Sequence, residues 1–455
     1  MPTDSGVDRA RLSSLAARER ATFADRHPRS AAAYSRAGHL FGRVPMTWMN
    51  KNAGGFPVYV ATARGARVTD IDGHEYIDFC LGDTGAMAGH SPAPVVEAVT
   101  RRLADRGGAT TMLPTEDAAA VGDELARRFG LPYWSFALTA TDANRWAIRL
   151  LRAVSGRTKI LVHSYCYHGS VDETLIVAGP SGEGESREGN VGAPTDVTTT
   201  SRVAEFNDLA GLERELAHGD VAAVLMEPAL TNIGIVLPTP GYLAGVRALT
   251  RKYGTYLIND ETHTFSAGPG GATAAWDLRP DVLTIGKAIG GGIPIGAYGL
   301  SEALAGALLG RPDLDLVDMG GVGGTLAGNP VSMAATLATL TSVLTDAAFA
   351  SMIDTATAFA GGVRKLIDAH ALPWSVSQLG ARAEYRFANP APLTGTESAA
   401  SADASLEDFL HLYLANRGIL LTPFHNMALM SPVTTLDDVA RHHEVFAGAL
   451  SELMS

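Results

Sequence analysis

Two stretches of the sequence bring together side chains that could do chemistry. The apolar run TYLIN ends in the acidic pair Asp260-Glu261, and the apolar run VLTIG ends in Lys287, with three glycines close behind it. About one strand–loop–strand unit separates the two runs, so we expect both groups at the ends of adjacent strands. Strand ends at one edge of a parallel sheet are where ligands bind.

An amine and a carboxylate at one sheet edge suit pyridoxal phosphate. This cofactor is an electron sink that joins a lysine as a Schiff base and needs a carboxylate to keep its pyridine nitrogen protonated. The flanking Ile285 and Ile289 favour the neutral, nucleophilic form of the Lys287 amine. The alternative is a surface lysine at a strand end. Lysine is scarce, which makes its context informative: the chain has only Lys51, Lys159, Lys252, Lys287 and Lys365.

The elements around these groups indicate an α/β fold. From about residue 115 to 300, apolar runs such as KILVHS and VAAVLM alternate with helical stretches at 144–154 and 242–253. This alternation predicts a mostly parallel central sheet with helices on both faces. Asp72-Gly73 between two alternating runs predicts a hairpin. We expect loops at 270–280 and 388–404 and one long helix at 331–347.

The length of 455 residues is too great for one core, so we expect two domains. The sequence predicts an N-terminal arm, hairpin and part of a small domain over 1–85. A large cofactor-binding domain is expected over 86–330. The C-terminal part of the smaller α+β domain is expected over 331–455, so that the small domain is built from both chain ends.

Composition excludes several classes of protein. The net charge of −12 argues against nucleic acid and against an anionic membrane surface. The two cysteines, Cys80 and Cys166, exclude a disulfide framework and favour a reducing compartment. No apolar run is long enough to span a bilayer, and the first residues lack a signal-peptide core, so a cytoplasmic location is expected. No histidine or cysteine cluster has metal-ligand spacing, so no metal is predicted.

Several motifs occur in a fixed order over residues 40–450. They are GARVTDIDGHEYIDFC, GHSPAPVVEAV, YHGSVDET, MEPALTNIGIVLPTPGYL, NDETHT, TIGKAIGGGIPIGAYG and GGTLAGNPVSMAA. This order resembles the class III aminotransferases, which are pyridoxal-phosphate enzymes of fold type I. The subgroup most similar is glutamate-1-semialdehyde aminomutase with its transaminase relatives.

The resemblance implies roles for residues around the cofactor ring. Lys287 resembles the Schiff-base lysine that also carries the substrate proton, and Asp260 resembles the partner of the pyridinium. Tyr167 resembles the aromatic side chain that stacks on the ring, in a motif with His168. Thr262 is implied at the other face of the ring. Asn232 is implied near the phenolic oxygen of the cofactor.

The phosphate site departs from the family pattern. The family has Ser-Gly-Thr-Glu-Ala where this chain has Thr139-Ala140-Thr141-Asp142-Ala143. A hydroxyl and the N–H groups at a helix N-terminus can still hold a phosphate. The alternative for this segment is a plain helix cap. Gly324-Thr325 resembles a loop that reaches the phosphate of a neighbouring subunit, which implies a homodimer with shared active sites.

The substrate-binding residues are harder to assign. Trp48 stands where the aminomutase has an arginine for the substrate carboxylate, and Met427 stands where it has a glutamate. Arg382 and Arg386 are then the candidates for gripping a carboxylate. The alternative for them is a salt bridge to Glu384 or a surface strand. Further candidates near the site are Arg43, His168, His263 and His425.

We therefore expect an aminotransferase that moves an amino group between an amine or amino acid and a keto acid or aldehyde. An aminomutase or racemase on the same scaffold is the alternative, because both use Lys287 as the proton carrier. A non-enzymatic binding protein is a third possibility, and the presence of Lys287, Asp260 and Tyr167 together argues against it. The apolar Trp48 and Met427 predict a substrate with an apolar or aromatic portion.

Overall fold

The computed structural model describes residues 5–192 and 195–455, and the chain divides into two compact units. The larger unit comprises 93–349 and 393–399. The smaller unit comprises the described residues up to Pro92 together with 350–392 and 400–455. Both chain ends therefore contribute to the smaller unit. The sequence prediction placed its boundaries earlier, after residues 85 and 330.

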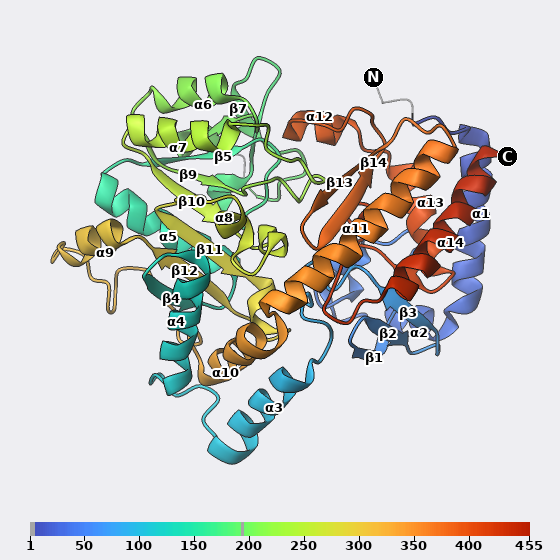
Figure 1. Cartoon of the computed structure of the whole chain (residues 1–455), viewed down its shortest axis with the longest axis horizontal. Helices are drawn as coiled ribbons and strands as arrows, with labels where there is room; N and C mark the ends of the chain where they lie inside the picture. The colour runs from blue at the N-terminus through green and yellow to red at the C-terminus, as the bar shows by residue number, and fades with distance from the viewer. Residues whose placement is uncertain (1–4, 193–194) are drawn as a thin grey trace. The chain divides into compact units, whose positions relative to one another are not determined.

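A seven-stranded sheet forms the centre of the larger unit, in the order β4-β12-β11-β10-β9-β5-β8 (Figure 1). Strand β12 runs antiparallel to both of its neighbours, and the remaining neighbouring pairs are parallel. The mostly parallel sheet predicted from the sequence is confirmed. The strands are β4 (Tyr133–Ala137), β5 (Lys159–His163), β8 (Ser201–Ala204), β9 (Val221–Met226), β10 (Tyr256–Asp260), β11 (Val282–Gly286) and β12 (Gly296–Leu300).

Helices and short segments surround this sheet. Helix α5 packs along strands β9 to β12, and α7 packs against α6 and β10. The helices are α3 (Ala93–Arg101), α4 (Glu116–Phe129), α5 (Ala140–Ser155), α6 (Leu209–Leu216), α7 (Tyr242–Lys252), α8 (Gly271–Ala275), α9 (Glu302–Leu309) and α10 (Pro330–Ala338), with η6 (Thr264–Ala267), η7 (Lys287–Gly290) and the hairpin β6 (Ile176–Ala178) and β7 (Gly184–Ser186).

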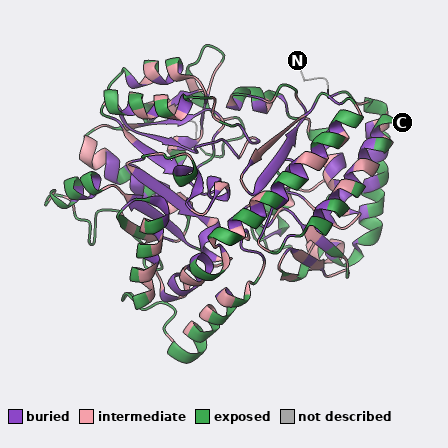
Figure 2. Cartoon of the chain, viewed as in Figure 1, coloured by how far each residue is buried: buried purple, intermediate pink, exposed green. Residues whose placement is uncertain are grey.

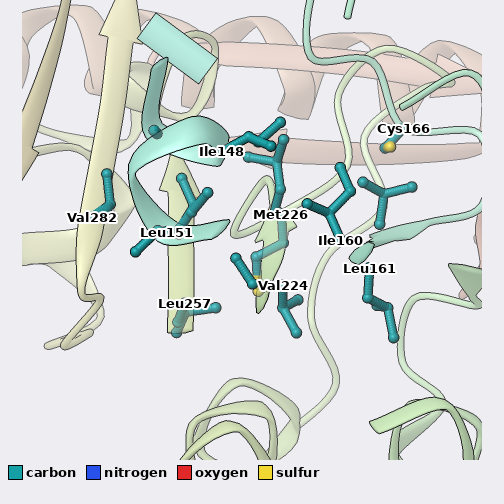
Figure 3. Packing of buried hydrophobic residues seen from close by; sticks show 14 of the residues in the cluster. Ile148, Leu151, Ile160, Leu161, Cys166, Val224, Met226, Leu257 and Val282 are labelled. Atoms are coloured by element: carbon teal, nitrogen blue, oxygen red, sulfur yellow. The ribbon is translucent and has the colours of Figure 1, made fainter. Parts of the chain in front are cut away.

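The central strands are buried on both faces, as the purple arrows in Figure 2 show. All residues of β9 and β11 are buried, which explains their unbroken apolar runs. Figure 3 shows side chains of α5 packing beside those of the strands, for example Ile148 and Leu151 near Met226 and Val282. This core holds the strand ends of the sheet in fixed positions.

The smaller unit is α+β. The hairpin predicted at Asp72-Gly73 is confirmed, because β2 and β3 pair antiparallel around it. A three-stranded sheet, β13-β14-β16, lies in the same unit. The elements are α1 (Arg9–Arg26), α2 (Pro28–Arg36), η1 (Phe41–Arg43), η2 (Thr47–Asn50), β1 (Val60–Arg64), β2 (Arg67–Asp70), β3 (Glu75–Asp78), most of α11 (Asp346–Ala369), β13 (Ser375–Leu379), β14 (Arg382–Arg386), α13 (Ala404–Ala415), β15 (Ile419–Leu420), β16 (Met427–Leu429) and α14 (Leu436–Met454).

The single helix predicted over 331–347 was wrong. The α-helix ends at Ala338, and a π-helical turn follows to Val343. The hydroxyl of Thr339 donates to the Ala335 carbonyl and the Leu344 N–H bonds back to Thr339, which widens the last turn. Thr345 then accepts from the Ala348 N–H and begins α11.

Two predicted loops contain short helices. Within 270–280, α8 begins where the Glu261 carboxylate accepts the N–H groups of Ala272 and Thr273. Within 388–404, α12 (Gly395–Ala400) follows Thr394, whose hydroxyl accepts from the Glu397 N–H. The first helix depends on a tertiary contact that local sequence does not contain.

Within the described residues, no single helix is long and apolar enough to cross a bilayer. One helix pair, Pro330–Val343 with Asp346–Ala369, is long and apolar enough only when its two helices are taken together, and these meet at a bend of 69°.

Candidate active site

Asp260 ends β10 in the larger unit, and three groups donate hydrogen bonds to its carboxylate. The Asn144 amide and the His168 Nδ1–H each donate to Oδ2 at 2.9 Å. The Thr262 backbone N–H donates to Oδ1 at 3.0 Å. Asp260 is almost fully buried, so these donors replace the water that a carboxylate would otherwise bind.

These contacts keep Asp260 ionised. Burial alone would raise the pKa of its carboxyl, but the His168 bond and charge, with the bonds from Thr262 and Asn144, lower the pKa to about 2. Burial would lower the pKa of His168, whereas neighbouring Cys166 and Asp260 raise it well above its ordinary value. Asp260 therefore carries a negative charge at neutral pH, as a partner for a protonated ring nitrogen must.

Asn144 was missed by sequence reasoning. It lies on α5, fully buried, and its amide group also donates to the His168 carbonyl at 3.1 Å. Its carbonyl oxygen accepts from the Thr284 hydroxyl at 2.6 Å. One side chain thus links α5, β10 and β11 at the level of Asp260. A buried asparagine inside an amphipathic helix was the available signal, because such a group needs partners.

Lys287 directly follows β11, the strand next to that of Asp260. Strands β10 and β11 are parallel neighbours, with Asp260 paired to Thr284. Lys287 follows the end of β11 in the left-handed backbone region, with φ of 48°. For a residue other than glycine this conformation costs about 1–3 kcal/mol, and it is found mostly where function requires it. The prediction of adjacent strand ends is confirmed.

The Lys287 amine contacts His263. Lys287 Nζ lies 2.9 Å from His263 Nε2, and His263 is buried. The amine can donate to the neutral imidazole, which fixes the direction of the flexible lysine side chain. Sequence reasoning placed His263 near the site without identifying this contact.

The N-terminus of α5 provides N–H groups at the same edge of the sheet. The Thr139 hydroxyl accepts from the Asp142 N–H, so the helix cap that the sequence left as the alternative is present. Ala140 and Thr141 begin the helix, and the first N–H groups of a helix have no partner within it. A Cβ added at Gly169 would overlap the Thr141 hydroxyl, so glycine there permits the loop after β5 to approach α5.

Glu227 and Asn232 form a second polar group beyond β9. The Asn232 amide donates to the Glu227 carboxyl at 3.3 Å, and the Thr231 hydroxyl also donates to it. Burial raises the pKa of Glu227 to about 7, although His168 and Thr231 oppose that rise. Tyr167 is 43% exposed and Thr262 is buried, with a hydroxyl that has no hydrogen-bond partner among the described residues.

The contact of Gly324-Thr325 with a second subunit stays a prediction. Both residues are exposed, and nearby Val317, Met319 and Leu326 expose apolar side chains.

The predicted substrate-binding residues lie in the smaller unit. Arg382 is fully buried and donates to the Thr84 hydroxyl at 2.7 Å. Arg386 lies 3.9 Å from both Glu384 and Glu407, in the kind of ion pair that the sequence left open as its alternative. Their contact with substrate stays a prediction.

The other candidates in this unit differ in exposure. His425 is buried with Nδ1 3.1 Å from Glu384. Trp48 is 49% exposed and its ring centroid lies 5.7 Å from that of Phe424. Arg43 is exposed and lies over the Tyr34 ring. Their roles toward substrate also stay predictions.

The donor set in the larger unit fits pyridoxal phosphate. It offers an amine for the aldehyde, an ionised buried carboxylate for the ring nitrogen and a helix N-terminus for the phosphate. The partly exposed Tyr167 offers a ring face, and the unpaired Thr262 hydroxyl offers a polar contact. The fold and the site together define a fold type I enzyme that uses pyridoxal phosphate.

The chain belongs to the class-III aminotransferase family. The model of the family described as "Aminotransferase class-III" matches residues 48–448. Pyridoxal phosphate is the cofactor, and the family acts on small amine and amino-acid substrates.

Individual relatives are more specific. A glutamate-1-semialdehyde 2,1-aminomutase of Desulfitobacterium hafniense (strain Y51) is 36% identical over 383 residues, covering 82% of this chain and 86% of the relative. A solved glutamate-1-semialdehyde-aminomutase from Pseudomonas aeruginosa PAO1, a lysine-to-alanine variant in complex with PMP, is 46% identical with a TM-score of 0.96 and covers 98% of this chain and 100% of its own. A solved omega-transaminase from Sphaerobacter thermophilus is 30% identical with a TM-score of 0.84, covering 94% and 98%.

Proposed function

We propose that this enzyme is an aminomutase, which exchanges an amino group between two carbons of one small substrate. Amino-group chemistry rests on one observation: the Lys287 amine follows the strand that pairs with the strand of ionised Asp260. The choice of an intramolecular transfer rests on the relatives named glutamate-1-semialdehyde aminomutases, at 36% and 46% identity. The sequence alone favoured an aminotransferase and left an aminomutase as the alternative. These relatives favour the aminomutase instead.

The residues of the larger unit supply the parts of this chemistry. When bound, pyridoxal phosphate withdraws electrons from the carbon that carries the amine. Asp260 keeps a proton at the ring nitrogen because its own pKa is about 2. The Lys287 amine is the group that can take a proton from one substrate carbon and return it to another position. His263 holds that amine in place between the transfers.

The start of α5 would bind the phosphate. The N–H groups of Ala140 and Thr141, with the Thr141 hydroxyl, offer donors at the positive end of a sixteen-residue helix. This anchor would hold the cofactor ring at the sheet edge, so that the ring stays beside Lys287 throughout the reaction. Tyr167 would cover one face of the ring and exclude water from it.

A second candidate is an aminotransferase acting on an amine or amino acid with an apolar portion. Trp48 and Met427 stand where a charged pair is expected for the aminomutase substrate, and apolar walls favour apolar substituents by about 0.8 kcal/mol per buried methylene. This observation is the reason to keep transamination as the competing function.

Single-substrate turnover separates the two. The enzyme is loaded with its cofactor, given glutamate-1-semialdehyde alone, and assayed for the isomeric amino ketone. An aminomutase needs no second substrate, so product should exceed the number of active sites many times. Consumption of glutamate-1-semialdehyde that stops at about one equivalent per site, gives the deaminated dicarbonyl and not the isomer, and resumes when a keto acid is added would support the aminotransferase.

We also propose a homodimer with shared active sites. The exposed apolar side chains of Val317, Met319 and Leu326 flank Gly324-Thr325, and exposed apolar patches mark interaction surfaces. A cytoplasmic location is proposed from the composition alone.

A further inference from the structure

The segment 393–399 belongs to the larger unit, although the chain on both sides of it belongs to the smaller unit. The chain leaves the smaller unit after Pro392 and returns to it at Ala400. The segment includes most of α12, and we call it the clasp. Neither the proposed reaction nor the family resemblance described above gives the clasp a role.

The clasp contacts the loop that follows β5. A Cβ on Gly395 would come within 2.1 Å of the Ser164 carbonyl oxygen and 3.3 Å of the Tyr165 side chain, so the two backbones meet at a glycine. Tyr165 has a φ of 60°, a conformation that a tyrosine retains only where its surroundings enforce it. The same loop continues to Tyr167 and His168, which lie at the candidate cofactor site.

The clasp also contacts the loop that follows β9. The Ser398 hydroxyl is buried and donates to the Ile233 carbonyl oxygen at 2.5 Å. Ile233 directly follows Asn232, the residue implied near the phenolic oxygen of the cofactor. The clasp therefore bonds to the backbone next to a side chain that is expected to contact the cofactor.

Two side chains from the turn after β8 fasten the clasp. The Asn207 amide donates to the Leu393 carbonyl at 2.8 Å and to the Leu237 carbonyl at 3.0 Å. Asn207 thus joins the start of the clasp to the end of the loop after β9. The Glu205 carboxylate accepts from both the hydroxyl and the backbone N–H of Thr396.

These contacts join the ends of three parallel strands. The strands are neighbours in the order β9-β5-β8, so the loops that follow them leave from the same edge of the sheet. Ligands bind at this edge in α/β sheets. A binding site must hold its side chains close to their productive positions, and supporting contacts outside the site provide that precision. One segment that bonds to all three loops restricts their independent movement.

We propose that the clasp is a positioning element for the cofactor: it holds the loop of Tyr167 and the loop of Asn232 in the positions that the ring requires. Gly395 and Ser398 act through these two loops and are positioning residues. This inference rests on the proposed function only in its use of pyridoxal phosphate, which an aminomutase and an aminotransferase share.

Visible circular dichroism of the cofactor-loaded enzyme tests this role, because the signal of a bound ring depends on the fixed groups around it. Gly395→Ala places a methyl group 2.1 Å from the Ser164 carbonyl oxygen, so the clasp or the loop must shift. The signal per bound cofactor should fall, and the rate of cofactor loss on dilution should rise at least about tenfold. Gly306→Ala in α9 is the matched control, because its Cβ would meet none of the described residues within 4 Å.

Ser398→Ala is the second variant. It removes one hydroxyl without adding an atom, so it should fold even if Gly395→Ala does not. Its dichroism and its rate of cofactor loss should change in the same directions, because the Ile233 carbonyl loses its donor. The melting temperature of each variant is measured as well, since a purely structural role would lower it without altering the signal of the bound cofactor.

Two results would overturn the proposal. One is a wild-type cofactor signal and a wild-type rate of cofactor loss in folded Gly395→Ala and Ser398→Ala. The other is a lowered melting temperature with an unchanged cofactor signal, which would make the clasp a contributor to stability alone. Because neither readout involves glutamate-1-semialdehyde, either result leaves the proposed aminomutase activity unaffected.

Discussion

Asp260 retains its charge in surroundings that would normally neutralise a carboxylate. Three donors, from Asn144, His168 and Thr262, bind its two oxygens within the buried edge of the sheet. Such preorganised donors cost no rearrangement when charge develops during a reaction. The neighbouring Glu261 instead accepts the N–H groups that begin α8, so two adjacent carboxylates have different tasks.

Asp260→Asn should therefore separate cofactor binding from turnover. The variant keeps the shape of the side chain but loses the charge that holds a proton at the ring nitrogen. Cofactor should still bind through the phosphate, while turnover should fall about 10²–10³-fold. Glu261→Gln is the matched control, with reduced stability but turnover per folded site near that of the wild type. Full turnover in Asp260→Asn would mean that another carboxylate is the partner.

Glu227 gives the unfolding free energy a defined pH dependence. Its pKa rises from 4.5 to about 7 on folding because it is buried. A raised folded-state pKa means that the folded protein binds the proton more tightly, so this contribution is complete below pH 4.5 and lost as the pH rises through 7. The loss should be about 3 kcal/mol. Chemical denaturation of wild type and Glu227→Gln from acid to neutral pH measures it, and parallel curves would show that Glu227 does not titrate there.

At the scale of single residues, the sequence predicted the side chains that follow a local pattern. It missed the side chains whose role depends on tertiary contacts. Lys287 and Asp260 follow apolar runs, so their positions at strand ends could be predicted. Asn144 gave no motif, because its importance comes from partners on two distant strands. The His263 contact with Lys287 likewise depends on how two loops meet.

At the scale of elements, the beginning of α5 connects the sheet to the proposed phosphate site. Its approach to the loop after β5 depends on Gly169, which has a φ of 81° and leaves no room for a Cβ beside Thr141. The helix, the loop and the strand ends must therefore pack in one arrangement for the N–H groups to face a phosphate.

Gly169→Ala should weaken cofactor binding. The added methyl group would displace Thr141 and the first turn of α5, and we expect affinity for pyridoxal phosphate to fall at least about tenfold. Gly130→Ala is the control: its φ is 74°, its Cβ would meet nothing within 4 Å, and it carries the same backbone strain of about 1–2 kcal/mol. Titration of the apoenzyme with cofactor measures both. If the two variants bind pyridoxal phosphate with equal affinity, the backbone strain that they share, and not the clash with Thr141, determines the affinity.

Elements with continuous apolar runs were predicted, and those with mixed composition were not. The runs that became β5, β9, β10 and β11 are fully or almost fully buried. Strand β12 was missed because GAYGL has two glycines in five residues, yet it pairs antiparallel between β4 and β11. The short α12 had a signal in Thr394 and Glu397, which form a capping arrangement.

At the scale of the whole molecule, the proposed dimer has a specific requirement. Gly324-Thr325 is exposed, whereas Lys287 and Asp260 lie at the sheet edge of the same unit. If the loop reaches the phosphate of a second subunit, every active site draws on two chains. The interface is then necessary for catalysis as well as for stability.

Complementation between two inactive chains tests this sharing. Lys287→Ala removes the lysine, and Thr325→Asp places a negative charge where a partner's phosphate is expected. Each variant alone should be inactive. Co-expressed chains should recover about a quarter of wild-type activity, because half of the dimers are mixed and each mixed dimer has one intact site. No recovery in a mixture shown to contain mixed dimers would contradict shared sites.

The attachment of the cofactor to Lys287 is the central claim, and one measurement tests it directly. Borohydride reduction of the cofactor-loaded enzyme fixes the bond between lysine and cofactor, and peptide mapping by mass spectrometry then locates it. We predict label on the peptide containing Lys287 and none in Lys287→Ala. Label on Lys51, Lys159, Lys252 or Lys365 instead would contradict the account.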